Sequence, residues 1–367
     1  MSQDFFTECF VGSMPPAVGE PIDAQKMQRS GSVRPLNYTG GEVRRSEHDW
    51  VAVTCRQIAR ALKVPTAALL TGTNYLHYPV RLGAGAIASP LVSYRINHGY
   101  LPPLRYADWA IQDFETFERL EREAGKPSGA QFWRSTGTPK AYQTFSGVVG
   151  HLDAFEDLMI VANKKILDKH PEVALQFDMP TELAMGQVRY TEYDDLYNFY
   201  VGSLKPAGRV IRATPVGTGF VFHATCEGDL GGKPLLPAWR RSPVADVAMI
   251  NAISAMPEWQ EGWNLLAVHD SFGNGKQLPQ IAVSTVKLYE DLLQPPPEGT
   301  VFGMGIVQPD ISVRQIEALA KDFRPMLERK GVTRGAIGNF CGMGRETLAE
   351  AKLCIGNMQA AVYELNS

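Results

Sequence analysis

The sequence is poor in cysteine and has no pair of cysteines at the spacing of a metal knuckle. The number of cysteines is odd, and no CxxC motif occurs. A disulfide framework or a zinc finger is therefore not expected, and reduced thiols in a cytoplasmic compartment are the default. The cysteines are Cys9, Cys55, Cys226, Cys341 and Cys354.

The sequence also lacks targeting and membrane features. Its first residues, MSQDFFTECFVGSMPP, contain neither a basic segment nor a long apolar one. We therefore expect no signal peptide. No apolar stretch approaches the length needed to cross a bilayer, so we expect no membrane partner.

Excess positive charge is missing as well. The formal net charge is −3, whereas proteins that bind duplex nucleic acid usually carry a basic excess, at least locally. The balance counts against nucleic-acid binding without excluding it, because a basic channel can lie inside an acidic shell. There is no GxxxxGK[ST] loop, no GxGxxG between a strand and a helix, and no GxSxG elbow.

What is present is an ordinary globular composition. The chain has 367 residues, of which 44% are apolar and 20% are charged. That length can bury a substantial core and predicts about two domains, or one large domain with lobes. The 25 prolines and 34 glycines indicate many turns, which makes a pure helical bundle improbable.

Composition and periodicity divide the chain into four regions. Three consecutive prolines, Pro295 to Pro297, form the clearest break. The regions are an extended N-terminal arm (1–45), a mainly helical region (46–170), an α+β region (171–294) and a C-terminal helical region (295–367).

Amphipathic patterns and cap signals predict the individual elements. A helix is expected after Ser46, ending before Pro65. Further helices are expected at 105–124, 151–169, 244–256, 280–293, 312–330 and 345–365. Strands are expected at 173–177 and 264–268, and a hairpin from 209–213 and 219–225 around the turn Thr214–Gly217.

One segment, LLAVHDSFGNG, has the form of a catalytic turn. A buried strand delivers Asp270 to a sharp, glycine-containing turn. Phosphoryl transfer assisted by two metals needs carboxylates held on adjacent strands of a rigid sheet, and Asp270 is placed to be one of them. The same pattern also fits an ordinary turn after a strand, where Asp and Gly are favoured.

The order of motifs around this turn is more specific. The turn Thr214–Gly217, a helix bearing Asp246 and the run His269–Gly273 follow one another. This order resembles the C-terminal palm of the single-subunit RNA polymerases of phages and mitochondria. The resemblance implies an α+β fold of palm and fingers, with mixed helices and a small antiparallel sheet. It also implies Mg²⁺ bound by Asp270, with His269 supporting the turn.

The resemblance extends to FWRSTGTPKAYQTFSG. Its implied roles are stabilisation of triphosphate charge by Arg134 and Lys140, and nucleotide binding by Tyr142 and Gly147. A solvated turn is the alternative interpretation, because Ser-Thr-Gly-Thr-Pro is typical of loops.

The first metal-binding carboxylate of the family is absent. In RPLNYTGG, Thr39 stands where the polymerases have Asp, and a hydroxyl does not replace a bridging carboxylate. Asp49 or Asp178 would have to supply it; otherwise the chain is an inactive relative. An active form would need a partner subunit or a homo-oligomer, and its other partners would be nucleotides and nucleic acid.

Two other hypotheses remain open. The arm, the loop-rich aromatic body and the mild acidity also suit a virion or capsid subunit, which would place the chain in a virion rather than a cytoplasm. The third is an enzyme whose site is assembled from residues that sequence spacing does not group.

Overall fold

The computed structural model describes residues 4–12, 14–40, 54–63, 90–125, 128–148, 150–224, 242–271, 278–340, 342–343 and 346–367. Eight strands in this part of the chain form one sheet in the order β1-β8-β7-β6-β5-β4-β3-β2. Every paired strand is parallel to its neighbour. The strands are β1 (Phe6–Cys9), β2 (Asn37–Thr39), β3 (Gln131–Gly137), β4 (Ala174–Asp178), β5 (Gly219–Ala224), β6 (Asn264–Ser271), β7 (Val301–Val307) and β8 (Arg334–Asn339).

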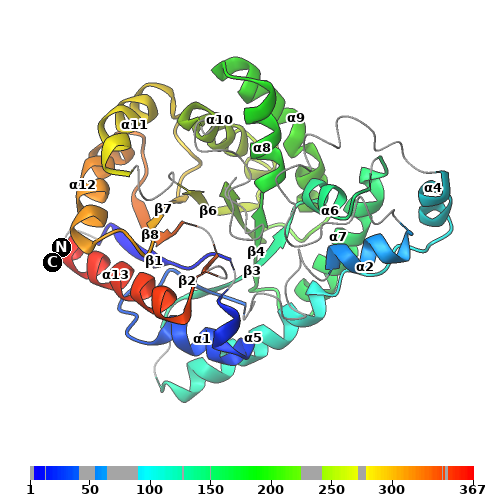
Figure 1. Cartoon of the computed structure of the whole chain (residues 1–367), viewed down its shortest axis with the longest axis horizontal. Coiled ribbons are helices and arrows are strands. Elements are labelled where there is room, and N and C mark those ends of the chain that lie inside the picture. Colours follow the sequence, from blue (N-terminus) through cyan, green and yellow to red (C-terminus); the bar gives the residue numbers. More distant parts are fainter. Residues whose placement is uncertain are drawn as a thin grey trace.

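The two edges of the sheet meet at a bridge between Glu8 and Pro35. The sheet thereby closes into a barrel (Figure 1). The backbone N–H of Glu8 donates to the carbonyl of Arg34 at 2.9 Å, and Leu36 N–H donates to the carbonyl of Glu8 at 2.8 Å. The buried carboxylate of Glu8 also accepts from the N–H groups of Val33 and Arg34. These bonds leave little free edge between β1 and β2.

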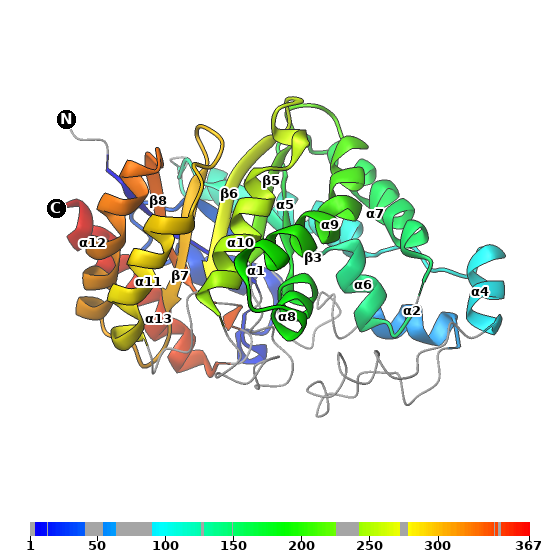
Figure 2. The same ribbon diagram turned by 90° about the horizontal axis from the view of Figure 1, so that it is seen from above.

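Helices surround the barrel and connect successive strands (Figures 1 and 2). Parallel neighbours need such crossovers because the chain must return to the same end of the sheet. The alternation of eight strands and outer helices is that of a (β/α)₈ barrel. The main crossover helices are α1 (Pro21–Arg29), α5 (Tyr106–Glu123), α7 (Leu152–Leu167), α9 (Tyr193–Arg212), α10 (Pro243–Ser254), α11 (Leu278–Leu292) and α12 (Val313–Arg329), and α13 (Leu348–Asn366) follows β8.

Four further α-helices lie beside these in the described part of the chain. They are α2 (Cys55–Ala61), α4 (Pro90–Asn97), α6 (Pro139–Phe145) and α8 (Pro180–Arg189). The helix α6 begins just after β3, and α8 begins just after β4. Both therefore start at the end of the barrel where the strands terminate.

The expected palm with a small antiparallel sheet is wrong. The sheet is all-parallel, and the expected hairpin does not form. Residues 209–212 end α9, and only the second half of the hairpin is a strand, β5. Taken by itself, the short run RVIRA is compatible with a strand or with a helix. The helix prevails because Val210 and Ile211 continue the buried face of α9, while Arg209 and Arg212 pair with Glu156 and Glu258.

The long helices were predicted well from their sequence patterns. The helices expected at 105–124, 151–169, 244–256, 280–293, 312–330 and 345–365 correspond to α5, α7, α10, α11, α12 and α13. The strands expected at 173–177 and 264–268 correspond to β4 and β6. All four expected regions contribute strands to the one barrel.

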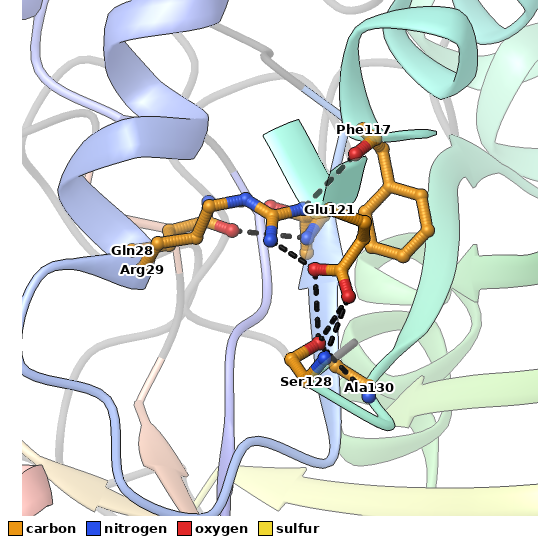
Figure 3. Close-up of polar contacts among 7 residues, drawn as sticks. Gln28, Arg29, Phe117, Glu121, Ser128 and Ala130 are labelled. Carbon is orange, nitrogen blue, oxygen red and sulfur yellow. Dashed lines mark hydrogen bonds and ion pairs between the residues drawn. The ribbon is translucent and has the colours of Figure 1, made fainter. Parts of the chain in front are cut away.

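Polar contacts hold α1 against α5 (Figure 3). Arg29, at the end of α1, donates to the carboxylate of Glu121 and lies 4.3 Å from the ring centre of Tyr38. Glu121 also accepts from the N–H of Ser128, at 2.7 Å, in the segment that enters β3. The neighbouring residue Gln28 donates its side-chain N–H to the hydroxyl of Thr39 at the end of β2. The network therefore holds α1, the helix of the first crossover, against α5, the end of β2 and the segment before β3.

The described residues form two apolar cores. The larger lies between the barrel and its helices. The smaller fills the barrel interior, and Trp133 is its largest side chain. Its other members are Cys9, Val11, Leu36, Ala174, Val221, Ala267, Val301 and Ala336.

Candidate functional site

The barrel interior changes from apolar to polar along four neighbouring strands. Side chains alternate along a strand, so positions two apart face the same side. Each of β3, β4, β5 and β6 has an apolar interior residue, and the interior residue two positions after it in the sequence is polar. The pairs are Trp133 and Ser135, Ala174 and Gln176, Val221 and His223, and Ala267 and His269.

Asp178, the last residue of β4, is the centre of this polar cluster. Ser135 donates its hydroxyl to Oδ2 of Asp178 at 2.7 Å, and Gln176 donates to Oδ1 at 2.8 Å. Nδ1 of His223 lies 3.1 Å from the same Oδ1. Because a carboxylate only accepts, these three contacts fix its position and require the Nδ1–H tautomer of His223.

His269 lies beside His223 on the next strand. The ring centres are 5.0 Å apart, and the rings meet edge to face. His269 is fully buried, and neither ring nitrogen has a hydrogen-bond partner in the described part of the chain. Burial lowers the pKa of His269 well below its usual range, and the proximity of His223 lowers it further. The ring is therefore neutral at neutral pH.

Two glycines make room for this imidazole. A Cβ on Gly338 would lie 2.6 Å from Nε2 of His269, and a Cβ on Gly303 would lie 2.8 Å from its Cδ2. Both glycines stand two residues after an apolar interior residue, Val301 in β7 and Ala336 in β8. At the positions that contact the His269 ring, β7 and β8 therefore have glycine and no side chain.

Two of the residues expected from sequence lie in this cluster. His269 and Asp178 are linked through His223, which the sequence interpretation did not select. Asp270, the expected metal ligand, faces the other side of the sheet, where the hydroxyl of Tyr289 on α11 donates to its carboxylate. Asp49 lies outside the described residues.

The expected nucleotide-binding residues do not gather at the barrel end. Arg134 is buried behind β3, where its guanidinium pairs with Asp113 at 3.1 Å. The hydroxyl of Tyr142 lies 2.8 Å from the Thr136 hydroxyl, and Gly147 forms a turn with φ +74° after α6. Lys140 lines a separate hollow among the helices.

The polymerase interpretation of these residues is therefore wrong. Its palm is replaced by a parallel barrel, and its catalytic Asp lies behind the strand. The virion-subunit alternative is wrong as well. The first 45 residues, which favoured it as an arm, supply β1, α1 and β2 of the barrel.

No metal centre is found within the described ranges, where no three His, Cys, Asp or Glu residues converge as ligands. The magnesium prediction came from the polymerase resemblance and loses that support. None of the described helices is long and apolar enough to cross a membrane.

Sequence reasoning missed His223, Ser135 and Gln176. A signal existed, because each lies two residues beyond a buried apolar position in a short apolar strand. That signal is readable only once the strands are known to be parallel neighbours, whereas β5 was interpreted as half of a hairpin.

No protein-family model matches the chain, and no curated protein matches it. Several solved structures are similar to the chain at low identity, and two of them are described here. One is a B12-independent methionine synthase from Shewanella sp. W3-18-1 in complex with selenomethionine, 12% identical, with a TM-score of 0.41 over 72% of this chain and 67% of that one. The other is a psychrophilic glycoside hydrolase family 10 endo-β-1,4-xylanase, 9% identical, with a TM-score of 0.38 over 97% of each chain. Likeness at this level establishes no activity, and the barrel itself is defined by the order and register of its strands.

Proposed function

We propose that the protein is an enzyme that catalyses proton transfer on a small molecule at the C-terminal end of the barrel. The observation that carries this proposal is the contact between Asp178 and His223, at the C-terminal ends of β4 and β5. Catalytic residues of (β/α)₈ enzymes come from the ends of several strands at this face. An imidazole held by a carboxylate is a common general acid–base device.

Asp178 would act as a positioning residue. Its hydrogen bonds to Ser135 and Gln176 hold the carboxylate, and the carboxylate in turn holds Nδ1–H of His223. This tautomer makes Nε2 the nitrogen that accepts a proton. A carboxylate at Nδ1 also stabilises the imidazolium that forms when His223 takes the proton.

His269 would serve as a neutral hydrogen-bonding group beside the base. Its low pKa keeps it uncharged when His223 is protonated. Buried polar atoms without partners are rare in folded proteins, and each calls for an explanation such as a bound ligand or water. A substrate atom or a water at the nitrogens of His269 would explain both orphaned positions.

The first test is a mass-spectrometric screen of wild-type protein in D₂O. The panel contains small carboxylic acids, sugars, amino acids and nucleosides, and both conversion and deuterium incorporation are measured. We expect His223→Asn to lower the rate of any conversion found by about 10²- to 10⁴-fold, the usual contribution of a general acid or base. Asp178→Asn should lower it by a similar factor, because the amide would favour the wrong tautomer.

The matched control is Lys26→Met, which removes an exposed charge from α1, away from the strand ends. A conversion that proceeds at the wild-type rate in His223→Asn contradicts the proposal. The ¹⁵N-imidazole spectrum gives a readout that needs no substrate. We expect the Nδ1–H form of His223 in the wild-type protein and its loss in Asp178→Asn.

A further inference from the structure

A second candidate site lies outside the barrel, among α6, α7, α8 and α9. A hollow of about 460 Å³ opens there, lined by residues of these helices and by none from a strand. This volume falls within the range of small-molecule sites. Part of its wall is apolar, with Met185 and Phe199, and part is charged, with Lys140, Glu182 and Arg189.

The carboxyl group of Glu182 is the most unusual part of the wall. The residue is only 2% exposed, and the hydroxyl of Thr138 donates to its Oε1. Its Oε2 has no hydrogen-bond partner among the described residues. Burial raises the pKa of Glu182 to about 7, although Thr138 and Lys140 oppose the rise. A buried carboxyl oxygen without a donor is costly unless a ligand supplies one.

Two cations line the same hollow and form no ion pair with Glu182 within the described ranges. Lys140 is half-buried, and its ammonium donates to Oε1 of Gln143 at 3.0 Å. Burial lowers the pKa of Lys140. Arg189 is exposed, with its guanidinium 5.7 Å from the ring centre of Phe199. An acid and two bases thus line one space without neutralising one another directly.

We propose that this hollow binds a small zwitterion, an α-amino acid with an apolar side chain. The ligand carboxylate would lie against Lys140 and Arg189, and its ammonium would donate to Oε2 of Glu182. The side chain would pack against Met185 and Phe199. A simple carboxylic acid would satisfy the cations and leave Oε2 of Glu182 without a donor.

Binding should therefore depend on pH through Glu182. The charged groups in the wall are Lys140 from α6 and Arg189 from α8 itself, and α9 offers only the uncharged Asn198 and Ser203. The third helix that packs against α8, α10, carries one ionisable side chain, Asp246, which is not part of the wall. The ligand ammonium prefers ionised Glu182, so affinity should rise as pH increases through about 7. A simple carboxylate should show the opposite trend.

The test is isothermal titration calorimetry of the whole protein with L-leucine, L-methionine and L-phenylalanine. Two truncated probes accompany them, 4-methylpentanoate without the amine and leucinamide without the carboxylate. We expect at least one amino acid to bind, and 4-methylpentanoate and leucinamide to bind at least about tenfold more weakly than leucine, the size of one lost charge-assisted bond. Affinity for that amino acid should fall about tenfold between pH 8 and pH 6 because Glu182 becomes protonated.

One variant blocks the hollow without removing a charge. Gly202, in α9, lines the hollow, and a Cβ built there meets no atom within 4 Å. Gly202→Leu should therefore fold and abolish binding, and its circular dichroism and thermal unfolding would verify the fold. Glu182→Gln should weaken binding and remove its pH dependence, while Lys26→Met should bind as the wild type does.

Three results would overturn the proposal. They are no binding of any amino acid at millimolar concentration, binding that survives Gly202→Leu, and equal affinity for 4-methylpentanoate and leucine. His223→Asn should bind the amino acid normally, which separates this site from the proposed active site.

Discussion

The two ends of the barrel interior differ although the same strands build both. Nearer the N-terminal end, Trp133, Ala174 and Val221 belong to one buried, apolar layer. Two residues farther along the same strands, Ser135, Gln176 and His223 form a hydrogen-bonded cluster around Asp178. The apolar layer stabilises the barrel by burial. The polar layer contains groups that bond only to one another, together with His269, which has no partner among the described residues, and folding alone does not require such groups.

The largest effect is expected in the apolar layer. Trp133→Ala removes the largest side chain of the inner core and should lower the free energy of unfolding by about 3–5 kcal/mol. Urea denaturation measures the loss. Trp133→Phe keeps much of the volume and should cost clearly less. A loss below about 1 kcal/mol for Trp133→Ala would show that the inner layer does not support the barrel.

The second effect concerns acid stability. The pKa of His269 is lowered in the folded protein, so the unfolded chain binds the proton more readily. Stability should be full above about pH 6.5 and fall as the pH decreases below it, by at most about 1.4 kcal/mol per pH unit from this residue. Thermal or urea unfolding between pH 7 and pH 5 measures the slope.

His269→Leu is the control for that slope. It removes the titrating group together with two nitrogens that have no partner among the described residues, so the acid slope should become shallower. Stability at pH 7 should stay equal or rise, since no hydrogen bond to a described residue is lost. The same slope in both proteins would assign the acid sensitivity to other groups.

The third effect tests the space that the glycines leave. Gly303→Ala places a methyl group 2.8 Å from Cδ2 of His269 and 3.1 Å from its Cα and Cβ. We expect it to cost about 1–3 kcal/mol, the usual range for overpacking. In a His269→Ala background the cost should shrink, because the closest contact is gone. A double-mutant cycle by urea denaturation gives the coupling, and strictly additive losses would argue against the glycine–imidazole fit.

The smallest change in stability is expected when one hydrogen bond to Asp178 is removed. Ser135→Ala removes one of three donors to the carboxylate and should cost about 1 kcal/mol or less, as Gln176 and His223 remain. The ¹⁵N-imidazole signals of His223 should shift only slightly. If they change as much as in Asp178→Asn, Ser135 has a larger positioning role than its single bond suggests.

Local signals explain which parts of the fold were predictable. The patterns of α5, α7 and α12 are long and amphipathic, so one buried face identifies each of them. The strands are three to eight residues long, and a short apolar run fits a buried strand or a buried helix equally well. For that reason RVIRA was assigned to a strand although it ends α9.

The candidate site was predicted in part. His269 and Asp178 were selected because each ends an apolar run, and both are members of the cluster. His269 was expected to support the turn at Asp270, and Asp178 was one alternative for the missing metal ligand. Asp270 itself points to the opposite side of β6 and contacts Tyr289. Alternation along a strand allows only one of two adjacent residues to face the interior, and sequence alone did not tell which.

The sequence by itself determined the long helices, the strands β4 and β6, and the presence of polar residues at strand ends. Those features depend on residues close together in the chain, whose spacing is fixed by local geometry. The tertiary structure alone decided that the strands are parallel, that β1 and β2 close the barrel, and that Ser135, Asp178, His223 and His269 meet. These contacts join residues that are far apart in sequence, so their proximity follows from strand order and register, which no local pattern records.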